Sequence, residues 1–199
     1  MTPDAADGFN LYLDTGLLDA RQCGELIAEL SVAPEAPATL YGQGKTARVD
    51  ERARKVARLM PASETIARIT SRLHEARKAI AAHFGLPLKG FEEPQFLRYR
   101  AGDFFVAHQD GNTGMLLGDR EQVRKVSVVL FLNRQSEAGE AGTYGGGSLV
   151  FSEWRAGRKA GRYALSASAG SLVAFTSDTT HEVTPVTFGD RYSIVSWLG

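Results

Sequence analysis

Apolar residues recur at helical spacing twice in the first half of the chain, which predicts two amphipathic helices. Their apolar positions are Cys23, Leu26, Ile27 and Leu30 in the first helix, and Ile66, Ile69, Leu73, Ala76 and Ile80 in the second. The first helix begins after Asp19, a residue type that caps helix N-termini, and ends before Pro34 and Pro37, because proline cannot continue a helix. The second spans residues 63–84 and is followed by Gly85, a typical terminator.

From residue 91 onward, the pattern changes to short runs of β-branched and aromatic residues that are separated by glycine-containing turns. The predicted strands are residues 91–99, 104–108, 126–132, 147–151, 163–166, 171–175, 182–186 and 191–198, with a turn at 187–190 and one earlier strand at 9–13. Many short strands with such turns predict an antiparallel sandwich or barrel. No internal repeat or linker divides the chain, so we expect a single domain over residues 1–199.

The composition fits a globular domain, with 199 residues, 43% apolar residues and a formal net charge of zero from 23 basic and 23 acidic residues. This balance gives no electrostatic footprint for nucleic acid or for an anionic membrane, so we expect neither as a partner. Cys23 is the sole cysteine in the sequence, which excludes an internal disulfide and favours a reducing compartment. Residues 1–8 match no targeting signal, and no stretch reaches transmembrane length. We therefore expect a cytoplasmic protein, and its oligomeric state stays open.

Three potential metal ligands, His108, Asp110 and His181, stand at predicted strand ends. Residues two apart on an extended segment share a face, so the H-x-D pair projects both side chains the same way, and a distant histidine can complete the set. Two imidazoles and one carboxylate suit Fe(II) and leave coordination positions open. An isolated H-x-D is a weak motif, and here the strand context on both sides favours the metal site. His74 and His83 lie within a helical pattern and are interpreted as ordinary helix residues.

Longer motifs surround these ligands in a fixed order. They lie at 99–102, 108–110, 124 with 127–133, 145–149 with 151, 170–173, 181–186, and 189–191 through 197. The segment 96–198, about half of the chain, resembles the iron(II)- and 2-oxoglutarate-dependent oxygenases, and within them the prolyl-hydroxylase-like branch. The resemblance implies a double-stranded β-helix. We therefore expect a mainly β protein with flanking α-helices, with helix-rich N-terminal support in residues 1–90 and a cupin-like, jelly-roll catalytic core in residues 91–199.

The resemblance implies a cosubstrate as well as a metal: 2-oxoglutarate and dioxygen use the open positions on iron, and ascorbate can serve as reductant. The remote carboxylate of 2-oxoglutarate needs a fixed cation, and the planar guanidinium of Arg191 can bind it bidentately, which a lysine cannot do. Ser193 and Trp197 share the face of Arg191 on one strand, so Ser193 can add a hydroxyl while Trp197 closes the pocket. Tyr99 matches a family tyrosine that hydrogen-bonds this carboxylate; its alternative role is that of a core aromatic residue.

These cofactors imply a dioxygenase that hydroxylates an unactivated C–H bond and releases succinate and CO2. Phe131 stands where some oxygen-sensing prolyl hydroxylases have tyrosine, so the anchoring of 2-oxoglutarate relies more on Tyr99 and Arg191. Asp110 disfavours the halogenase variant of the family, which replaces this carboxylate with a small residue. Nucleic-acid demethylases of the family usually carry a second arginine six residues after the first, where this chain has Trp197. A non-catalytic jelly roll that binds metal and 2-oxoglutarate stays as an alternative.

For the substrate, the resemblance favours a prolyl or other residue of a peptide or protein, and the alternative is a free amino acid or another small molecule. Arg48 and Asp50 form an R-x-D that occurs at a similar distance from the iron ligands in oxygen-sensing prolyl hydroxylases, but a surface charge run is the more ordinary interpretation. Arg124, at a strand entry, can orient a peptide carbonyl or form a strand-end salt bridge. The connections 111–123 and 134–147 are long enough to form lids or a groove.

Overall fold

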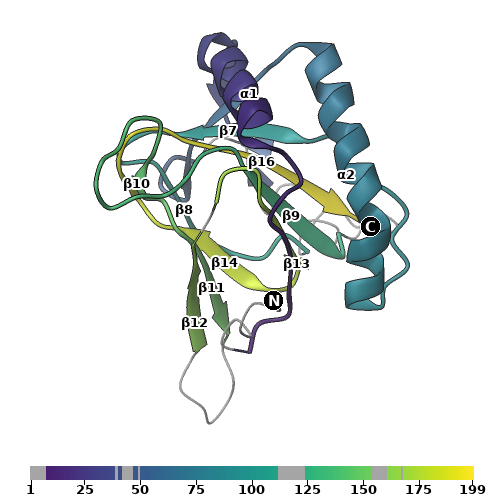
Figure 1. Ribbon diagram of the computed structural model, residues 1–199. Helices are drawn as coiled ribbons and strands as arrows, with labels where there is room; N and C mark the ends of the chain where they lie inside the picture. Colours follow the sequence, from purple (N-terminus) through teal and green to yellow (C-terminus); the bar gives the residue numbers. More distant parts are fainter. Residues whose placement is uncertain are drawn as a thin grey trace.

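The computed structural model describes residues 8–38, 40–41, 47–48, 50–111, 124–153, 161–166 and 168–199. Two antiparallel sheets form the centre of this part of the chain (Figure 1). The major, seven-stranded sheet has the order β1 (Leu11–Asp14), β13 (Leu172–Thr176), β9 (Val126–Phe131), β16 (Arg191–Leu198), β7 (Gln95–Tyr99), β6 (Ala57–Leu59) and β2 (Glu35–Pro37). The minor, five-stranded sheet has the order β12 (Gly161–Leu165), β11 (Leu149–Glu153), β14 (Thr180–Val183), β8 (Phe104–His108) and β5 (Arg54–Lys55). Two short pairs complete the description, β10 (Gly145–Gly146) with β15 (Val186–Phe188), and β3 (Leu40–Tyr41) with β4 (Ala47–Arg48).

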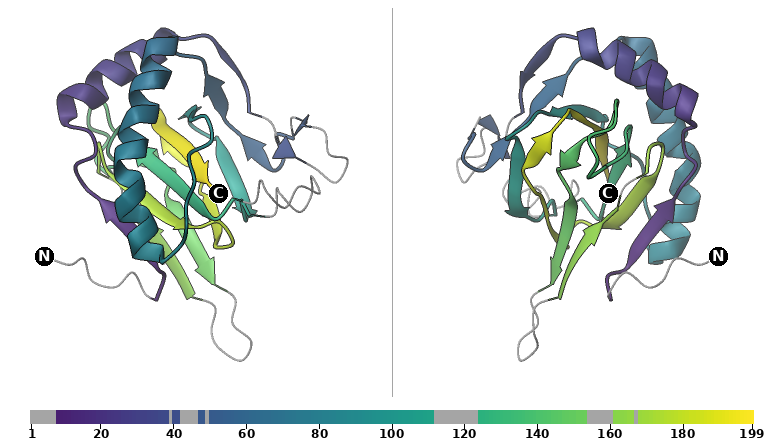
Figure 2. Two further views of the ribbon diagram at one scale, coloured as in Figure 1. Left: turned by 90° about the vertical axis from the view of Figure 1, so that its right-hand side faces the viewer. Right: turned by 60° about the vertical axis from the view of Figure 1, so that its left-hand side comes forward.

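Two helices, α1 (Ala20–Val32) and α2 (Ser63–Phe84), lie together against one face of the major sheet (Figure 2). The first turn of α1 forms a capping box, in which the Asp19 carboxylate accepts from the Gln22 N–H at 2.8 Å and the Gln22 side chain accepts from the Asp19 N–H at 3.0 Å. Helix α2 ends at Gly85, which adopts the left-handed conformation with φ 64°. Both helices and both of these terminal residues are as predicted from the sequence.

The major sheet separates two apolar cores, because successive residues of a strand point to opposite faces. In β9, Val128 and Leu130 pack with the helices, while Val129 and Phe131 pack toward the minor sheet. The inner core between the sheets also contains Phe151 from β11 among its members. Sheet on sheet with helices outside is the jelly-roll arrangement, so the predicted fold class is confirmed.

The predicted strand at 182–186 and the predicted turn at 187–190 are wrong in their bounds. Strand β14 starts earlier, at Thr180, and therefore includes His181; a second strand, β15, covers Val186–Phe188 and leaves a shorter turn at Gly189 and Asp190. Strand β15 exists because it pairs with β10, which lies about forty residues earlier in the chain. This pairing needs glycine, because a Cβ on Gly145 would lie 2.1 Å from the Phe188 ring.

The first ninety residues contribute strands to both sheets in addition to the two helices. Strands β1, β6 and β2 extend the major sheet on its two sides, and β5 forms one edge of the minor sheet beside β8. Pro37 is tolerated in β2 because that strand is at the sheet edge, where a missing N–H breaks no ladder. Strand β5 matters for the site, because it brings Arg54 next to the strand that ends in His108.

Among the described residues, no helix has both the length and the apolar character needed to cross a membrane.

Candidate metal and cosubstrate site

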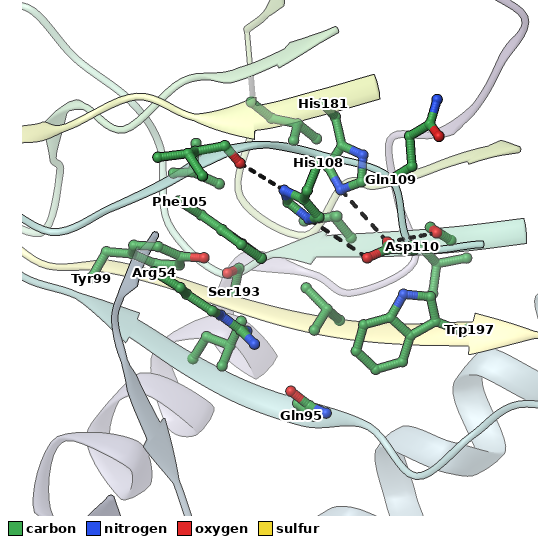
Figure 3. Close-up of a pocket in the computed structure, with 18 of the residues that line it drawn as sticks. Arg54, Gln95, Tyr99, Phe105, His108, Gln109, Asp110, His181, Ser193 and Trp197 are labelled. Atoms are coloured by element: carbon green, nitrogen blue, oxygen red, sulfur yellow. Dashed lines mark hydrogen bonds and ion pairs between the residues drawn. The ribbon is translucent and has the colours of Figure 1, made fainter. Parts of the chain in front are cut away.

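The two histidines of the predicted metal site lie side by side on the minor sheet. His108 ends β8, His181 lies in β14, and the two residues are paired across the strands. Asp110 follows β8 and approaches both rings: its Oδ1 is 3.6 Å from Nε2 of His108 and its Oδ2 is 3.5 Å from Nε2 of His181. The three ligand atoms all lie within 4.8 Å of one another (Figure 3). Such a cluster, on two adjacent strands and the segment after one of them, can hold one metal ion on a single triangular face.

Backbone carbonyls fix the orientation of both imidazoles. Nδ1 of His108 donates to the Val106 carbonyl at 2.8 Å, and Nδ1 of His181 donates to the Thr179 carbonyl at 3.0 Å. A carbonyl can only accept, so the proton is on Nδ1 and each Nε2 keeps its lone pair for a metal. Ser127 donates to Oδ2 of Asp110 at 2.7 Å and fixes the third ligand in the same way.

A β-bulge in β8 brings an aromatic ring against one ligand. Pairing of β8 with β14 shifts register between His181 and Val183, so two residues of β8 lie opposite one of β14. Phe105 and His108 therefore point to the same side, and their rings stack with centroids 3.6 Å apart. The Phe175 ring packs against the other histidine, His181, with the two ring centroids 4.7 Å apart. These contacts restrict the rotation of both imidazoles.

The electrostatics of the cluster favour the protonation states that a metal needs. Burial alone would raise the pKa of the Asp110 carboxyl, but the interaction with His108 and the charges of both imidazoles outweigh it and hold this pKa well below its usual range. Burial, reinforced by the charge of His108, lowers the pKa of His181 to about 4. At neutral pH the carboxylate is therefore ionised and the His181 imidazole is neutral, as ligands to a metal cation must be.

Arg191 lies in the inner core at the start of β16, with 1% of its surface exposed. Its Nη1 donates to Ser193 Oγ at 2.8 Å, whereas its Nε and Nη2 are buried and have no hydrogen-bond partner among the described residues. Rings of Tyr99, Phe131 and Tyr144 surround the guanidinium, with centroids 5.1, 5.2 and 5.9 Å from its Cζ. A buried cation with two unsatisfied donors is costly unless an anion binds it, so this arrangement fits a carboxylate ligand.

The metal cluster and Arg191 open into one cavity of about 310 Å³. Its wall includes Tyr99, Ser193 and Trp197 as well as the three metal-ligand candidates, so the predicted cofactor residues are brought together. Trp197 lies at the Asp110 end of this cavity, and its buried indole N–H has no hydrogen-bond partner among the described residues. Ser193 and Tyr99 lie at the Arg191 end, where Ser193 accepts from Nη1 and the Tyr99 ring centroid is 5.1 Å from Cζ.

Of the residues predicted to bind the substrate, Arg124 lines the cavity and Asp50 does not. Arg124 lines the cavity, stacks 3.6 Å above the Trp197 ring, and forms a two-point ion pair with Glu92 at 2.6 and 2.7 Å, which is the strand-end salt bridge that the sequence left open. Asp50 is not among the residues that line the cavity, and it accepts from the Arg52 N–H at 3.2 Å. The side chain of Arg48 and the segment 112–123 lie outside the described residues.

Three residues of this site were missed by the sequence reasoning. Phe105 and Arg54 line the cavity beside His108, and Tyr144 covers the Arg191 guanidinium. Tyr144 comes from the 134–147 connection, which contributes β10 and this buried ring; a lid or groove formed by this connection stays a prediction. Only the position of Phe105, three residues before His108 on one strand, was visible in the sequence, and strict alternation would have placed it on the opposite face.

A jelly roll with two histidines and one carboxylate at its mouth and a buried arginine in its interior defines an iron-dependent oxygenase that takes an organic acid as cosubstrate. Residues 94–199 match the family model of the 2OG-Fe(II) oxygenase superfamily, which is more than half of the chain. The protein therefore belongs to this superfamily, whose cofactors are Fe(II) and 2-oxoglutarate.

Several curated relatives are PKHD-type hydroxylases. The chain is 37% identical over 118 residues to one from Shewanella oneidensis, which is 57% of this chain and 45% of the relative. It is 32% identical over 168 residues to another from Maricaulis maris, which is 80% of this chain and 68% of the relative. The chain thus spans about half the length of the first of these relatives.

Solved structures of prolyl hydroxylases are also similar to this chain. A prolyl-4-hydroxylase from Pseudomonas putida superposes with a TM-score of 0.69 at 26% identity, covering 96% of this chain and 93% of that one. A prolyl hydroxylase from Trichoplax adhaerens, solved with a peptide of the hypoxia inducible factor, has a TM-score of 0.66 at 17% identity, covering 96% and 84%. The second likeness shows the fold alone.

Proposed function

We propose that this protein is an Fe(II)- and 2-oxoglutarate-dependent dioxygenase that hydroxylates a prolyl or other residue of a peptide or protein, with release of succinate and CO2. The observation that carries the proposal is the pair of buried, unpartnered donors on Arg191, in the same cavity as the cluster of His108, Asp110 and His181. A simple metal-binding jelly roll has no use for a buried guanidinium beside the metal. A cosubstrate that joins a metal-binding end to a carboxylate end explains both features.

Each residue has a defined part in this proposal. His108, Asp110 and His181 would hold Fe(II), which when bound supplies the activation of dioxygen. Arg191 would bind the remote carboxylate of 2-oxoglutarate through Nε and Nη2, while Ser193 holds the third guanidinium donor.

The walls around these groups position the reactants and exclude water. Tyr99 would add a hydrogen bond at the carboxylate, next to the guanidinium that its ring contacts. Trp197 covers the Asp110 end of the cavity, and Arg124 is held over Trp197 by Glu92. The side chains therefore act by orientation, and none of them needs to act as a nucleophile.

A peptide substrate is supported by the similarity to the Pseudomonas putida prolyl-4-hydroxylase, whose chain is covered almost completely. The fold itself also serves small molecules, since an epimerase solved with nogalamycin RO superposes with a TM-score of 0.62. We further propose a cytoplasmic location, which the single buried cysteine supports because a free thiol suits a reducing compartment.

The test combines cofactor binding with turnover. Anaerobic addition of Fe(II) and 2-oxoglutarate should give the weak visible charge-transfer band of a chelate, and absence of that band would reject the cofactor assignment. Oxygen-dependent succinate release is then measured with proline-containing peptides and with free amino acids, with and without ascorbate, and the added oxygen atom is located by mass spectrometry. Stimulation by free amino acids alone would overturn the peptidyl part of the proposal.

A further inference from the structure

A second hollow, of about 570 Å³, adjoins the cavity that contains the candidate metal ligands. Gln109 lines both hollows, and in the sequence it separates His108 from Asp110. Its side-chain amide donates to the Thr180 hydroxyl at 3.2 Å, which holds it beside β14, and Figure 3 shows it next to His181. The second hollow, which we call the outer groove, therefore meets the cavity at Gln109.

Strand pairing builds the outer groove from segments that are far apart in the sequence. Strand β1 pairs with β13, with Leu11 opposite Phe175, so the residues before β1 approach the turn after β13. Strand β11 pairs with β14, with Ser152 opposite Thr180, so the end of β11 forms another wall. The polar and aromatic lining residues from these segments are Phe9, Asn10, Ser152, Thr176, Thr179 and Thr180. All of them except Phe9 carry a hydroxyl or an amide, groups that can donate to or accept from the backbone of a peptide.

The charge of the outer groove comes from carboxylates. Among its described lining residues the charged ones are Asp178 and Glu153, and none is a lysine or an arginine. Asp178 is exposed, and its side chain has no hydrogen-bond or ion-pair partner in the described part of the chain. The groove therefore favours a ligand that brings a positive charge to Asp178.

The turn that carries Asp178 is held close to the metal ligands. The Ser177 carbonyl accepts from the Gly111 N–H at 2.8 Å, directly after the segment that supplies Asp110. Asp178 is three residues before His181. Three residues of chain span at most about 11 Å, and an extended peptide rises about 3.3 Å per residue. A basic residue within about four positions of a target residue at the metal can therefore reach Asp178.

We propose that the outer groove binds the chain of a peptide substrate, and that Asp178 selects a lysine or an arginine near the residue that is hydroxylated. This inference rests on the proposed dioxygenase function and specifies its substrate class as peptides with a basic residue close to the target. A free amino acid at the metal would leave the outer groove empty. A peptide extends beyond the cavity, and the groove that begins at Gln109 offers its backbone hydrogen-bonding partners and its basic side chain a carboxylate.

Moving one charge along a peptide tests the proposal without requiring turnover. The anaerobic protein loaded with Fe(II) and 2-oxoglutarate is titrated by calorimetry with end-blocked nonapeptides that have a central proline among alanines and serines. Lysine, glutamine or glutamate is placed in turn at each position on either side of the proline. At one or more positions the lysine peptide should bind about two- to fivefold more tightly than the glutamine peptide, as expected of one exposed ion pair. The preference should decrease at high salt, because salt screens an exposed pair.

Variants of Asp178 assign the preference to this residue. Asp178→Asn keeps the size of the side chain and should abolish the preference for lysine, whereas Asp178→Lys should favour glutamate at the same peptide position. Glu137→Gln neutralises another exposed carboxylate, which lines neither hollow, and should leave the preference intact. The visible chelate band should be the same in all of these variants, because neither residue lines the metal cavity.

The possible outcomes separate this inference from the function on which it rests. If the wild type binds the glutamine peptides but shows no preference for lysine at any position, Asp178 does not select the substrate. A preference for lysine that survives in Asp178→Asn overturns the inference in the same way. If no peptide binds although the chelate band forms, the peptidyl part of the proposed function fails, and this inference fails with it.

Discussion

At the scale of single residues, Arg191 combines full burial with incomplete hydrogen bonding. Only its Nη1 is satisfied by the described protein, through Ser193. We expect Arg191→Met to weaken 2-oxoglutarate binding by on the order of 2 to 5 kcal/mol, because it removes an ionic, hydrogen-bonded contact. Titration of the Fe(II) protein with 2-oxoglutarate measures this loss.

Iron affinity provides the control for this variant, because Arg191 contacts none of the candidate ligands. Fe(II) should still bind to Arg191→Met with little change, and Arg191→Lys should be intermediate for 2-oxoglutarate, since lysine keeps the charge without the planar fork. If Arg191→Met bound 2-oxoglutarate with normal affinity, Arg191 would not be the residue that binds its remote carboxylate. Loss of iron and 2-oxoglutarate together would indicate a folding defect in place of a lost contact.

Ser127 orients Asp110, one of the candidate metal ligands. Its hydroxyl donates to Asp110 Oδ2 at 2.7 Å and is also 2.8 Å from the Ser177 hydroxyl. Because outer hydrogen bonds orient metal ligands, Ser127→Ala should lower Fe(II) affinity by about 10- to 100-fold. The measurement is a competitive Fe(II) titration of the protein without 2-oxoglutarate.

A matched control for Ser127 is Ser171, whose buried hydroxyl donates to the Ser168 carbonyl and lies outside the cavity lining. Ser171→Ala should leave Fe(II) affinity unchanged. Equal iron affinities for the Ser127→Ala variant and the wild type would show that Asp110 needs no support from this hydroxyl.

At the scale of elements, helix α2 takes its N-terminal cap from another helix. Its own N-cap residue, Ala62, has no capping side chain. Instead the Glu29 carboxylate of α1 accepts from the Ala62 N–H at 3.0 Å and from the Thr65 hydroxyl at 2.8 Å. A carboxylate in this position satisfies free donors and interacts favourably with the helix dipole.

We expect Glu29→Ala to reduce the free energy of unfolding by about 1 kcal/mol, the typical value of a helix cap. For a chain of this length the loss corresponds to a decrease in Tm of about 2–4 °C. Thermal unfolding followed by circular dichroism measures it. The control is Glu25→Ala, which removes an exposed pair with Arg21 and should cost less. A Tm of Glu29→Ala equal to that of Glu25→Ala would contradict a capping role.

The elements that were predicted well are those whose signals are local. Helix α2 has its periodicity and its terminator within one segment, so its predicted bounds match the structure. Strand β15 was missed because it depends on pairing with β10, for which the run of glycines at 145–147 is the only local sign. The candidate site follows the same rule. Motif spacing in the sequence was enough to predict four of its residues, His108, Asp110, His181 and Arg191. Arg54 was not predicted, because it reaches the cavity through the pairing of β5 with β8.

At the scale of the whole molecule, the site joins the two sheets. The candidate metal ligands belong to β8, β14 and the segment after β8, at the minor sheet, while Arg191 and Ser193 belong to β16 of the major sheet. A 2-oxoglutarate molecule bound at both ends would therefore connect the sheets across the inner core. Global unfolding separates these sheets, so the ligand should oppose unfolding of the whole chain and not of one segment.

This connection predicts that metal and 2-oxoglutarate stabilise the protein cooperatively. Under anaerobic conditions with Fe(II), 2-oxoglutarate at 100 times its Kd should add about 2.7 kcal/mol to the free energy of unfolding, and it should add little without metal. In Arg191→Met the same ligand concentration should raise Tm far less, because only the metal end remains bound. Succinate, which has the remote carboxylate but no ketone next to a second carboxylate, provides the ligand control and should stabilise weakly. If 2-oxoglutarate raised Tm equally with and without Fe(II), its binding would not bridge the metal cluster and Arg191, and the two sheets would be joined by their apolar core alone.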